Sequence, residues 1–187
     1  AYDNSGRSVS LSSDGSVVAI GAYGNDGNGS DRGHVRIYQN VNNAWTQVGS
    51  DIDGEASYDE SGYSVSLSAD GSVVAIGAHL NDSNWLSSNH GHVRIYQNVS
   101  GTWTQVGSDI DGAANYDESG KSVSLSSDGS VVAIGAPYND GNEYSSGHVR
   151  IYQNVSGTWT QVGSDIEGEA YRDYSGHSVS LSADGSV

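Results

Sequence analysis

Hydrophobic residues along this chain follow patterns that predict short β-strands. In residues 8–12 (SVSLS), valine and leucine alternate with serine, which is the period of a strand with one buried face. Residues 17–22 (VVAIGA) form a nearly continuous apolar run, as expected for a strand buried on both faces. Residues 34–39 (HVRIYQ) alternate again, and residues 44–52 (AWTQVGSDI) form a fourth extended segment. No window carries apolar residues at 3.6-residue spacing, so the pattern predicts strands without helices.

Polar segments between these strands carry turn signals. Asp14-Gly15 separates the first two strands, and an Asp-Gly pair between extended runs favours a two-residue hairpin turn with positive φ at both positions. A polar loop of variable sequence precedes the third strand, and DGEASYDESG leads to the next unit. One unit therefore reads as four antiparallel strands, with short turns at one end and long loops at the other.

This unit is repeated along the chain. The segment GHVRIYQNVSGTWTQVGSDI occupies residues 91–110 and recurs at 147–166. The SVSLS segment starts at four serines with spacings of 56, 58 and 56 residues: Ser8, Ser64, Ser122 and Ser178. A fixed period of this size indicates a repeat architecture, and four-stranded units of this length are typical of β-propeller blades.

The predicted fold is an all-β repeat protein of four-stranded antiparallel propeller blades. It has about three blades and one extra strand, and the repeats are predicted at residues 5–60, 61–118 and 119–174, with the first strand of a fourth repeat at 175–187. Complete propellers have about four to eight blades. We therefore expect the chain to be part of a larger propeller or array, or else to have its blades completed by neighbouring chains.

The repeats resemble FG-GAP repeats, the blades of the integrin α-chain propeller. The resemblance rests on SGYSVSLSADGSVVAIGAHLND and SGKSVSLSSDGSVVAIGAPYND, on the GHVRIY segment, and on a glycine before each first strand: Gly6, Gly62, Gly120 and Gly176. It implies a propeller fold and an extracellular role. Two features depart from the family. Serine replaces the phenylalanine of the FG pair, and the calcium loop between the first two strands is reduced to Asp-Gly, too short to surround a calcium ion.

Composition narrows the possible partners. Acidic residues outnumber basic ones by 23 to 7, giving a net charge of −16, which disfavours nucleic acid and anionic membranes and suits cations or basic partners. The chain has no cysteine, so disulfides and thiolate chemistry are excluded. No apolar stretch approaches the ~20 residues of a membrane span, so membrane insertion is not expected.

Variation among the repeats is concentrated in the long loops, which carry most of the carboxylates. A fixed scaffold with variable loops is how binding surfaces are usually built. Calcium binding is a possible role for one equivalent aspartate per repeat, Asp26, Asp82 and Asp140. Other possible ligand contacts are Trp85, Asp59, Glu60, Asp117 and Glu118. The alternative is a set of solvated acidic loops whose Asn and Asp residues cap turns.

Other repeated residues have structural and functional interpretations. The histidines at 34, 92 and 148 suit cross-strand pairing with Asp or Tyr better than metal binding. The tryptophans at 45, 103 and 159 suit packing between blades, with sugar stacking as the alternative. Four sequons are possible N-glycosylation sites if the protein is secreted by a eukaryote: Asn28, Asn81, Asn98 and Asn154.

Together these observations predict a non-enzymatic module for adhesion or scaffolding, located outside the cell or at its surface. A protein or glycan partner is expected at the acidic loop face, and self-assembly through open edge strands is possible. A filament or appendage subunit and a carbohydrate-binding lectin are the two alternatives. No cofactor is expected with certainty, although calcium is possible, and no catalytic residues are identified.

Overall fold

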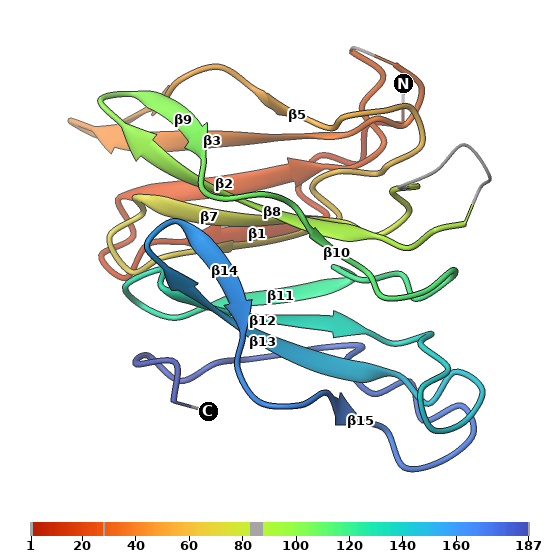
Figure 1. The fold of residues 1–187 in the computed structure, drawn as a ribbon. Helices are drawn as coiled ribbons and strands as arrows, with labels where there is room; N and C mark the ends of the chain where they lie inside the picture. The colour runs from red at the N-terminus through yellow and green to blue at the C-terminus, as the bar shows by residue number, and fades with distance from the viewer. Residues whose placement is uncertain (1, 28, 83–87, 187) are drawn as a thin grey trace.

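The computed structural model of the chain describes residues 2–27, 29–82 and 88–186 and shows three antiparallel β-sheets stacked along the sequence (Figure 1). No helix occurs in these residues. The first sheet contains β1 (Ser8–Leu11), β2 (Val17–Ala22), β3 (His34–Val41), β4 (Ala44–Gln47) and β5 (Ile52–Asp53). The second contains β6 (Ser64–Leu67), β7 (Val73–Ala78), β8 (His92–Val99), β9 (Thr102–Gln105) and β10 (Ile110–Asp111). The third contains β11 (Ser122–Leu125), β12 (Val131–Ala136), β13 (His148–Val155), β14 (Thr158–Gln161) and β15 (Ile166–Glu167).

Each sheet is a chain of hairpins in which the outermost strand is broken. The first three strands pair in sequence order, as predicted, but the fourth segment forms two short strands that both pair with the third. In the first sheet, Tyr38 lies opposite Gln47 while Val35 lies opposite Ile52, so the outer strand holds two extra residues. Gly49, with a φ of +74°, lies in this break. The alternation in the sequence did not reveal it.

The short turn between the first two strands differs from the predicted type. Gly15 has a φ of +70°, whereas Asp14 is not among the residues with positive φ. Gly15 N donates to Ser12 O at 2.9 Å, and the Asp14 carboxylate accepts from Ser16 N and from the Ser12 hydroxyl. The turn is therefore held by an aspartate that caps it, which explains why these hydrogen bonds lower the pKa of Asp14 to about 2.

The hydrophobic core lies between adjacent sheets. Val35 and Ile37 of β3 pack against Val74 and Ile76 of β7, and all four side chains are almost fully buried. An equivalent cluster joins the second and third sheets. Since each cluster is built from two sheets, a single repeat has no complete core of its own, which is the physical property of a repeat array.

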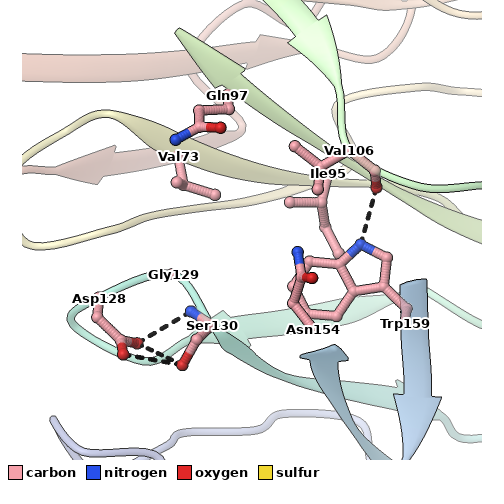
Figure 2. A pocket seen from close by; sticks show the side chains of 9 residues that line it. All are labelled: Val73, Ile95, Gln97, Val106, Asp128, Gly129, Ser130, Asn154 and Trp159. Atoms are coloured by element: carbon pink, nitrogen blue, oxygen red, sulfur yellow. Dashed lines mark hydrogen bonds between the residues drawn. The ribbon is translucent and has the colours of Figure 1, made fainter. Parts of the chain in front are cut away.

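Tryptophans on the outer strands close these interfaces, as the sequence predicted. Trp103 donates its indole N–H to Val48 O at 2.9 Å in the preceding sheet, and Trp159 donates to Val106 O at 2.8 Å. Beside Trp159 lies a hollow of about 190 Å³, lined also by Asn154 and the turn at Asp128 (Figure 2). A hollow of about 180 Å³ with equivalent lining residues lies at the first interface. Its recurrence marks it as a feature of how the repeats pack.

Serines of the first strand of each sheet join one sheet to the next. These first strands, β1, β6 and β11, are called the inner strands below. The Ser10 hydroxyl accepts a hydrogen bond from Leu67 N at 2.9 Å, and the Ser66 hydroxyl accepts from Leu125 N at 3.0 Å. In the same way, Ser8 Oγ donates to Gly62 O at 2.7 Å. The sequence indicated one buried face for these strands, but their serine face is also occupied, because it contacts the neighbouring inner strand.

We expect Ser66→Ala to lower the free energy of unfolding by about 1–2 kcal/mol, because Leu125 N would lose its acceptor in a half-buried position. Urea denaturation followed by circular dichroism measures this loss. Ser180→Ala is the matched control, since Ser180 is the equivalent residue of the fourth copy and is exposed. A change within about 0.5 kcal/mol is expected there. Equal losses in both variants would contradict this role for the serines.

The fourth copy of the first strand follows the third sheet without forming a ladder. No strand is assigned to residues 178–186, although Leu181 N donates to Ser124 Oγ at 3.0 Å and Ser127 N donates to Ala183 O at 2.8 Å. These are the contacts that successive inner strands make in the other copies. The segment therefore keeps the contacts between repeats but lacks the pairing within a repeat that the earlier copies have.

Short turns and long loops lie at opposite ends of the stacked sheets, as predicted (Figure 1). The β2–β3, β7–β8 and β12–β13 loops share one end with the segments that lead from each sheet to the next. This loop end brings together the residues by which the repeats differ. Within the part of the chain that the structure describes, no helix could serve as a membrane span.

Candidate functional site

Two of the positions at which the near-identical repeats differ lie at strand ends on the loop end. The residue just before each inner strand is Arg7, Tyr63, Lys121 or His177. The residue just after the second strand is Tyr23, His79 or Pro137. Each position is fixed by a strand end, so the backbone presents a different side chain at the same place in every sheet. Side chains that differ between repeats but are held by rigid strand ends are typical of a binding or catalytic site.

Aromatic rings and cations from successive sheets contact one another at these positions. The Tyr63 ring lies 3.9 Å from the His79 ring and 5.4 Å from the Tyr23 ring, measured between centroids. Lys121 Nζ lies 4.6 Å from the centre of the Tyr138 ring and 5.9 Å from that of Tyr63. These distances suit cation–π attraction and link the three sheets across the loop end.

Glu60 and Glu118 from consecutive repeats meet at one imidazole. His79 Nε2 lies 3.8 Å from Glu60 Oε2 and 3.9 Å from Glu118 Oε2. His79 is buried, whereas each glutamate side chain is about one fifth exposed. Lys121 donates a hydrogen bond to Glu118 Oε2. The cluster therefore places two solvent-accessible carboxylates and one ammonium over a buried histidine.

The loops that carry the two glutamates are held in the same way. Glu60 N donates to Asp31 O and Glu118 N donates to Asn89 O, both at 3.1 Å, which ties each loop to the preceding β–β loop. Both glutamates have positive φ, +55° and +51°. Non-glycine residues in this region store backbone strain of about 1–3 kcal/mol, and such strain persists where the surroundings fix the conformation.

Asp59 and Asp117, the other predicted contacts in these loops, point inward. Both are almost fully buried. Asp59 Oδ2 accepts from Ala56 N at 2.8 Å, and Asp117 Oδ2 accepts from Ala114 N at 2.9 Å. These hydrogen bonds close the loops on themselves. The two aspartates therefore support the adjacent glutamates rather than facing solvent.

Electrostatics distinguish the members of the cluster. Burial, together with nearby Asp31 and Glu118, raises the pKa of Glu60. Burial lowers the pKa of Lys121, but the hydrogen bond and the charge of Glu118, together with Tyr138 and Tyr63, outweigh burial and the net shift is upward. Burial, with a smaller contribution from Lys121, lowers the pKa of His79 to about 3. At neutral pH the imidazole is neutral and the ammonium is charged.

The buried neutral imidazole predicts a pH dependence of stability. The pKa of His79 is lowered from 6.5 to about 3, so the unfolded chain binds a proton that the folded chain excludes. Its contribution is complete above pH 6.5 and is lost as the pH falls towards 3, by at most about 1.4 kcal/mol per pH unit. We expect His79→Tyr, which restores the residue of the first repeat, to remove this slope. Urea denaturation of both proteins from pH 7 to pH 4 measures it.

The raised pKa of Glu60 acts in the opposite direction, because its contribution is present below pH 4.5 and is lost as the pH rises. Both proteins contain Glu60. Subtracting one stability curve from the other therefore removes the contribution of Glu60 and leaves that of His79. Parallel stability curves for the parent and for His79→Tyr would contradict a neutral imidazole in the folded state.

The three aspartates predicted to bind calcium lie in separate loops. Asp26 Oδ1 accepts from Asp31 N, Asp82 Oδ1 accepts from Ser88 N and Asn89 N, and Asp140 Oδ1 accepts from Ser145 N. Each therefore closes its own loop by accepting backbone hydrogen bonds. None belongs to a cluster of three potential metal ligands among the described residues. Calcium binding at these positions stays a prediction.

The remaining predicted contacts and sequons occupy varied environments. Trp85 and Asn28 lie outside the described residues. Asn81 is buried and its side chain hydrogen-bonds to Asp59, so its amide is inaccessible in the folded protein. Asn98 and Asn154 are half-buried, and their carbonyl oxygens accept from the backbone of the following turn. Glycosylation stays a prediction.

The repeated histidines of the third strands lie beside aspartates of the outer strand. The distance from Nδ1 to the nearest aspartate oxygen is 3.7 Å for His34, 3.7 Å for His92 and 3.9 Å for His148. The proximity to aspartate was predicted, but these histidines are buried rather than on an open polar face.

Sequence reasoning named Glu60 and Glu118 but missed His79, Tyr63 and Lys121. Periodicity highlights residues that recur, whereas these three differ from their equivalents in the other repeats. Their departure from otherwise near-identical copies was the available signal. The packing of one repeat on the next then brings them to the two glutamates.

Comparisons with known proteins support the repeat and the fold. Residues 1–38 match the family model of the FG-GAP repeat, which confirms the resemblance seen in the sequence. A search of curated proteins gave no significant match. Among solved structures, the chain is similar to a protein of Bacteroides uniformis described as a "putative 6-phosphogluconolactonase", with a TM-score of 0.57 and 14% identity over 88% of this chain and 41% of that one.

A second solved structure is the periplasmic gluconolactonase PpgL of Pseudomonas aeruginosa, with a TM-score of 0.37 and 10% identity over 85% of this chain and 56% of that one. The chain thus spans about two fifths to just over half of these structures. At this low identity, the similarity to the Bacteroides uniformis structure shows a shared fold and nothing about function.

The functional expectation from the sequence is corrected by these comparisons. We expected a non-enzymatic adhesion or scaffold module, with a filament subunit or a lectin as alternatives. The fold instead recurs in a protein described as a lactonase, which is an enzyme. The expectation was wrong because it took the role of the integrin-like relatives as the role of the fold, and one fold commonly supports unrelated functions.

Proposed function

We propose that this chain forms part of a β-propeller hydrolase that opens cyclic esters, with the reaction carried by Glu60, Glu118 and Lys121 over His79. One observation carries the proposal: two glutamates from consecutive repeats converge on a buried imidazole, with an ammonium hydrogen-bonded to one of them. The substrate class is taken from the Bacteroides uniformis protein of similar fold, which is described as a lactonase.

The propeller itself is part of this proposal. Contacts between β1 and β6 and between β6 and β11 place the first strands of successive sheets side by side, as the inner strands of neighbouring blades are placed. The outer side of the first sheet exposes Val9, Leu11 and Trp45, whose equivalents in later repeats are more buried. Further blades on that side would cover them and would add residues to the rim of the site.

The two carboxylates suit opposite roles in ester hydrolysis. Glu118, which is paired with Lys121, takes a proton from the attacking water. At the same time the water oxygen forms a bond to the lactone carbonyl carbon. Lys121 stabilises the negative charge that develops on the carbonyl oxygen. The bond from that carbon to the ring oxygen then breaks, and Glu60 donates a proton to the leaving oxygen. Proton exchange with solvent restores both glutamates, and the product is a hydroxy acid.

His79 is a positioning residue in this scheme. Its neutral ring packs against Tyr63 at a tilt of 38°, and its Nε2 lies within 3.9 Å of both carboxylates. A buried neutral group in that place keeps the pKa of Glu60 high without adding a competing charge. The negative charge of the chain, −16, favours an uncharged lactone over a phosphorylated one.

Export of the protein is part of the same proposal. Repeats of the FG-GAP family are typical of extracellular proteins, and residues 1–38 match that repeat. Cell fractionation of the source organism tests it, with an extracytoplasmic location as the expected result.

Hydrolysis of glucono-1,5-lactone by the full chain, followed by proton release at constant pH, tests the function. We expect a rate above the spontaneous one, and a loss of about 100-fold or more for Glu118→Gln or Glu60→Gln. Glu169→Gln is the matched control, because Glu169 is an exposed glutamate in the corresponding loop of the third repeat. It should leave the rate unchanged. A parent rate equal to the spontaneous one, or equal rates in all variants, would overturn the proposal.

A further inference from the structure

The third sheet contains a buried histidine whose ring nitrogen lacks a hydrogen-bond partner. His148 is 2% exposed, and its Nδ1 has no hydrogen bond although it faces Asp165 Oδ2 at 3.9 Å. This gap is too long for a hydrogen bond. An unsatisfied buried polar atom is costly, and each such atom in a native structure calls for an explanation.

Glu167 brings a second unsatisfied atom to the same place. It lies directly opposite His148 across the ladder between β13 and β15, and its Oε2 is buried without a hydrogen bond. Ligand atoms of His148, Asp165 and Glu167 all lie within 4.8 Å of one another. Near Glu167 Oε2 is Asn139 Oδ1, since both oxygens would touch a side-chain carbon placed on Gly141. Oxygen atoms of three side chains and one imidazole nitrogen therefore lie close together at this place.

The first two repeats lack this arrangement. The residue equivalent to Glu167 is Asp53 in the first and Asp111 in the second, one methylene shorter. The second sheet does gather Glu55, His92 and Asp109, but there Arg94 Nη2 contacts Glu55 Oε2 at 2.8 Å. A protein cation thus already neutralises that glutamate. In the third sheet, Arg150 contacts Asp165 and leaves Glu167 Oε2 unpaired.

We propose that His148 Nδ1, Asp165 and Glu167 bind a divalent first-row transition metal, with Zn²⁺ as the representative ion. One imidazole and two carboxylates form a donor set suited to such ions, whereas Ca²⁺ prefers six to eight oxygens. The hydrogen bonds from Gln161 and Arg150 to Asp165 hold its carboxylate in place, as outer-shell partners of metal ligands do.

The positive charge of Arg150 opposes a cation at this site, so the proposal requires the charges of Glu167 and Asp165 to outweigh it. Asp117 adds a further negative charge nearby, since Asn139 Nδ2 donates to Asp117 Oδ1 at 2.9 Å. This site is separate from the Glu60–Glu118 cluster. It does not depend on the proposed hydrolase activity.

Metal titration of the full chain, freed of metal with a chelator, tests the proposal. Zn²⁺ is titrated by calorimetry, and Co²⁺ is added as a spectroscopic probe of nitrogen and oxygen coordination. We expect one Zn²⁺ site that raises the melting temperature. Glu167→Asp should weaken Zn²⁺ binding about tenfold or more, because it restores the residue of the first two repeats and shortens the ligand. Since those repeats fold with aspartate, this variant should fold as well.

Two further variants separate this site from adventitious binding. His148→Gln should remove the visible Co²⁺ bands, whereas Glu55→Gln, in the cluster that Arg94 already neutralises, should leave Zn²⁺ affinity unchanged. The proposal is overturned if the parent binds no Zn²⁺, or if Glu167→Asp and His148→Gln both bind it as the parent does. Neither readout depends on hydrolysis, so failure here is distinguishable from failure of the proposed function.

Discussion

Gly77→Ala is expected to destabilise the protein by about 3 kcal/mol, although alanine suits the backbone conformation of the strand. Gly77 lies in β7, and a methyl group on it would lie 2.0 Å from Gly120 O and 2.4 Å from Ser64 Oγ. Gly120 belongs to the segment that enters the next sheet, so the clash would push two repeats apart. Backbone cannot move aside as a flexible side chain can.

The matched control is Gly101→Ala, at the tip of the β8–β9 turn. No atom lies within 4 Å of the added methyl group there, and the cost comes only from its φ of +87°. We expect about 1–2 kcal/mol for this conformational strain. Thermal and urea denaturation of both variants measure the difference. If Gly101→Ala cost as much as Gly77→Ala, the glycine in the strand would reflect conformation rather than close approach between repeats.

The strands and the repeat were predictable because they follow from local pattern. Period-two alternation, a continuous apolar run and turn residues recur at a fixed spacing, and the structure places β1, β2 and β3 where these patterns lie. The break between β4 and β5 was not predictable, because no alternation of hydrophobic and polar residues marks where the outer strand is interrupted. It follows from where the outer strand meets the neighbouring sheet through Gly49 and Trp103.

The contacts between repeats could not be predicted from the pattern of hydrophobic and polar residues. The serines of β1 and β6 look like a solvated face in one repeat, yet Ser10 and Ser66 accept hydrogen bonds from the next inner strand. The glycine in VVAIGA likewise appears as a small residue in a crowded strand, while its partner, Gly120, lies 43 residues further along the chain from Gly77. Only the packing of one sheet on the next reveals either role.

The candidate site shows the same division. Glu60 and Glu118 could be named because acidic residues recur in the loops, but nothing local indicates that both reach His79. The hydrogen bonds by which Asp59 and Asp117 close their own loops were not predicted either, and ligand contact by these two aspartates stays a prediction. The expected function was wrong because repeats and composition describe a fold, and one fold commonly supports unrelated functions.

Trp159→Ala is expected to cost about 3 kcal/mol, because it removes an indole that seals the interface between the second and third sheets. The ring packs against the core cluster shared by these sheets and donates to Val106 O at 2.8 Å (Figure 2). Its removal would enlarge the neighbouring hollow of about 190 Å³ and leave a carbonyl without its donor. Urea denaturation followed by far-ultraviolet circular dichroism measures the loss.

The same substitution in the first repeat separates packing between sheets from a property of tryptophan itself. Trp45 occupies the equivalent position, but its sheet has no described neighbour on that side and the side chain is 49% exposed. Trp45→Ala should therefore change stability by less than about 1 kcal/mol. If the two variants lost equal stability, the tryptophans would act within their own hairpins, and the sheets would have to be held together by the valines, isoleucines and serines alone.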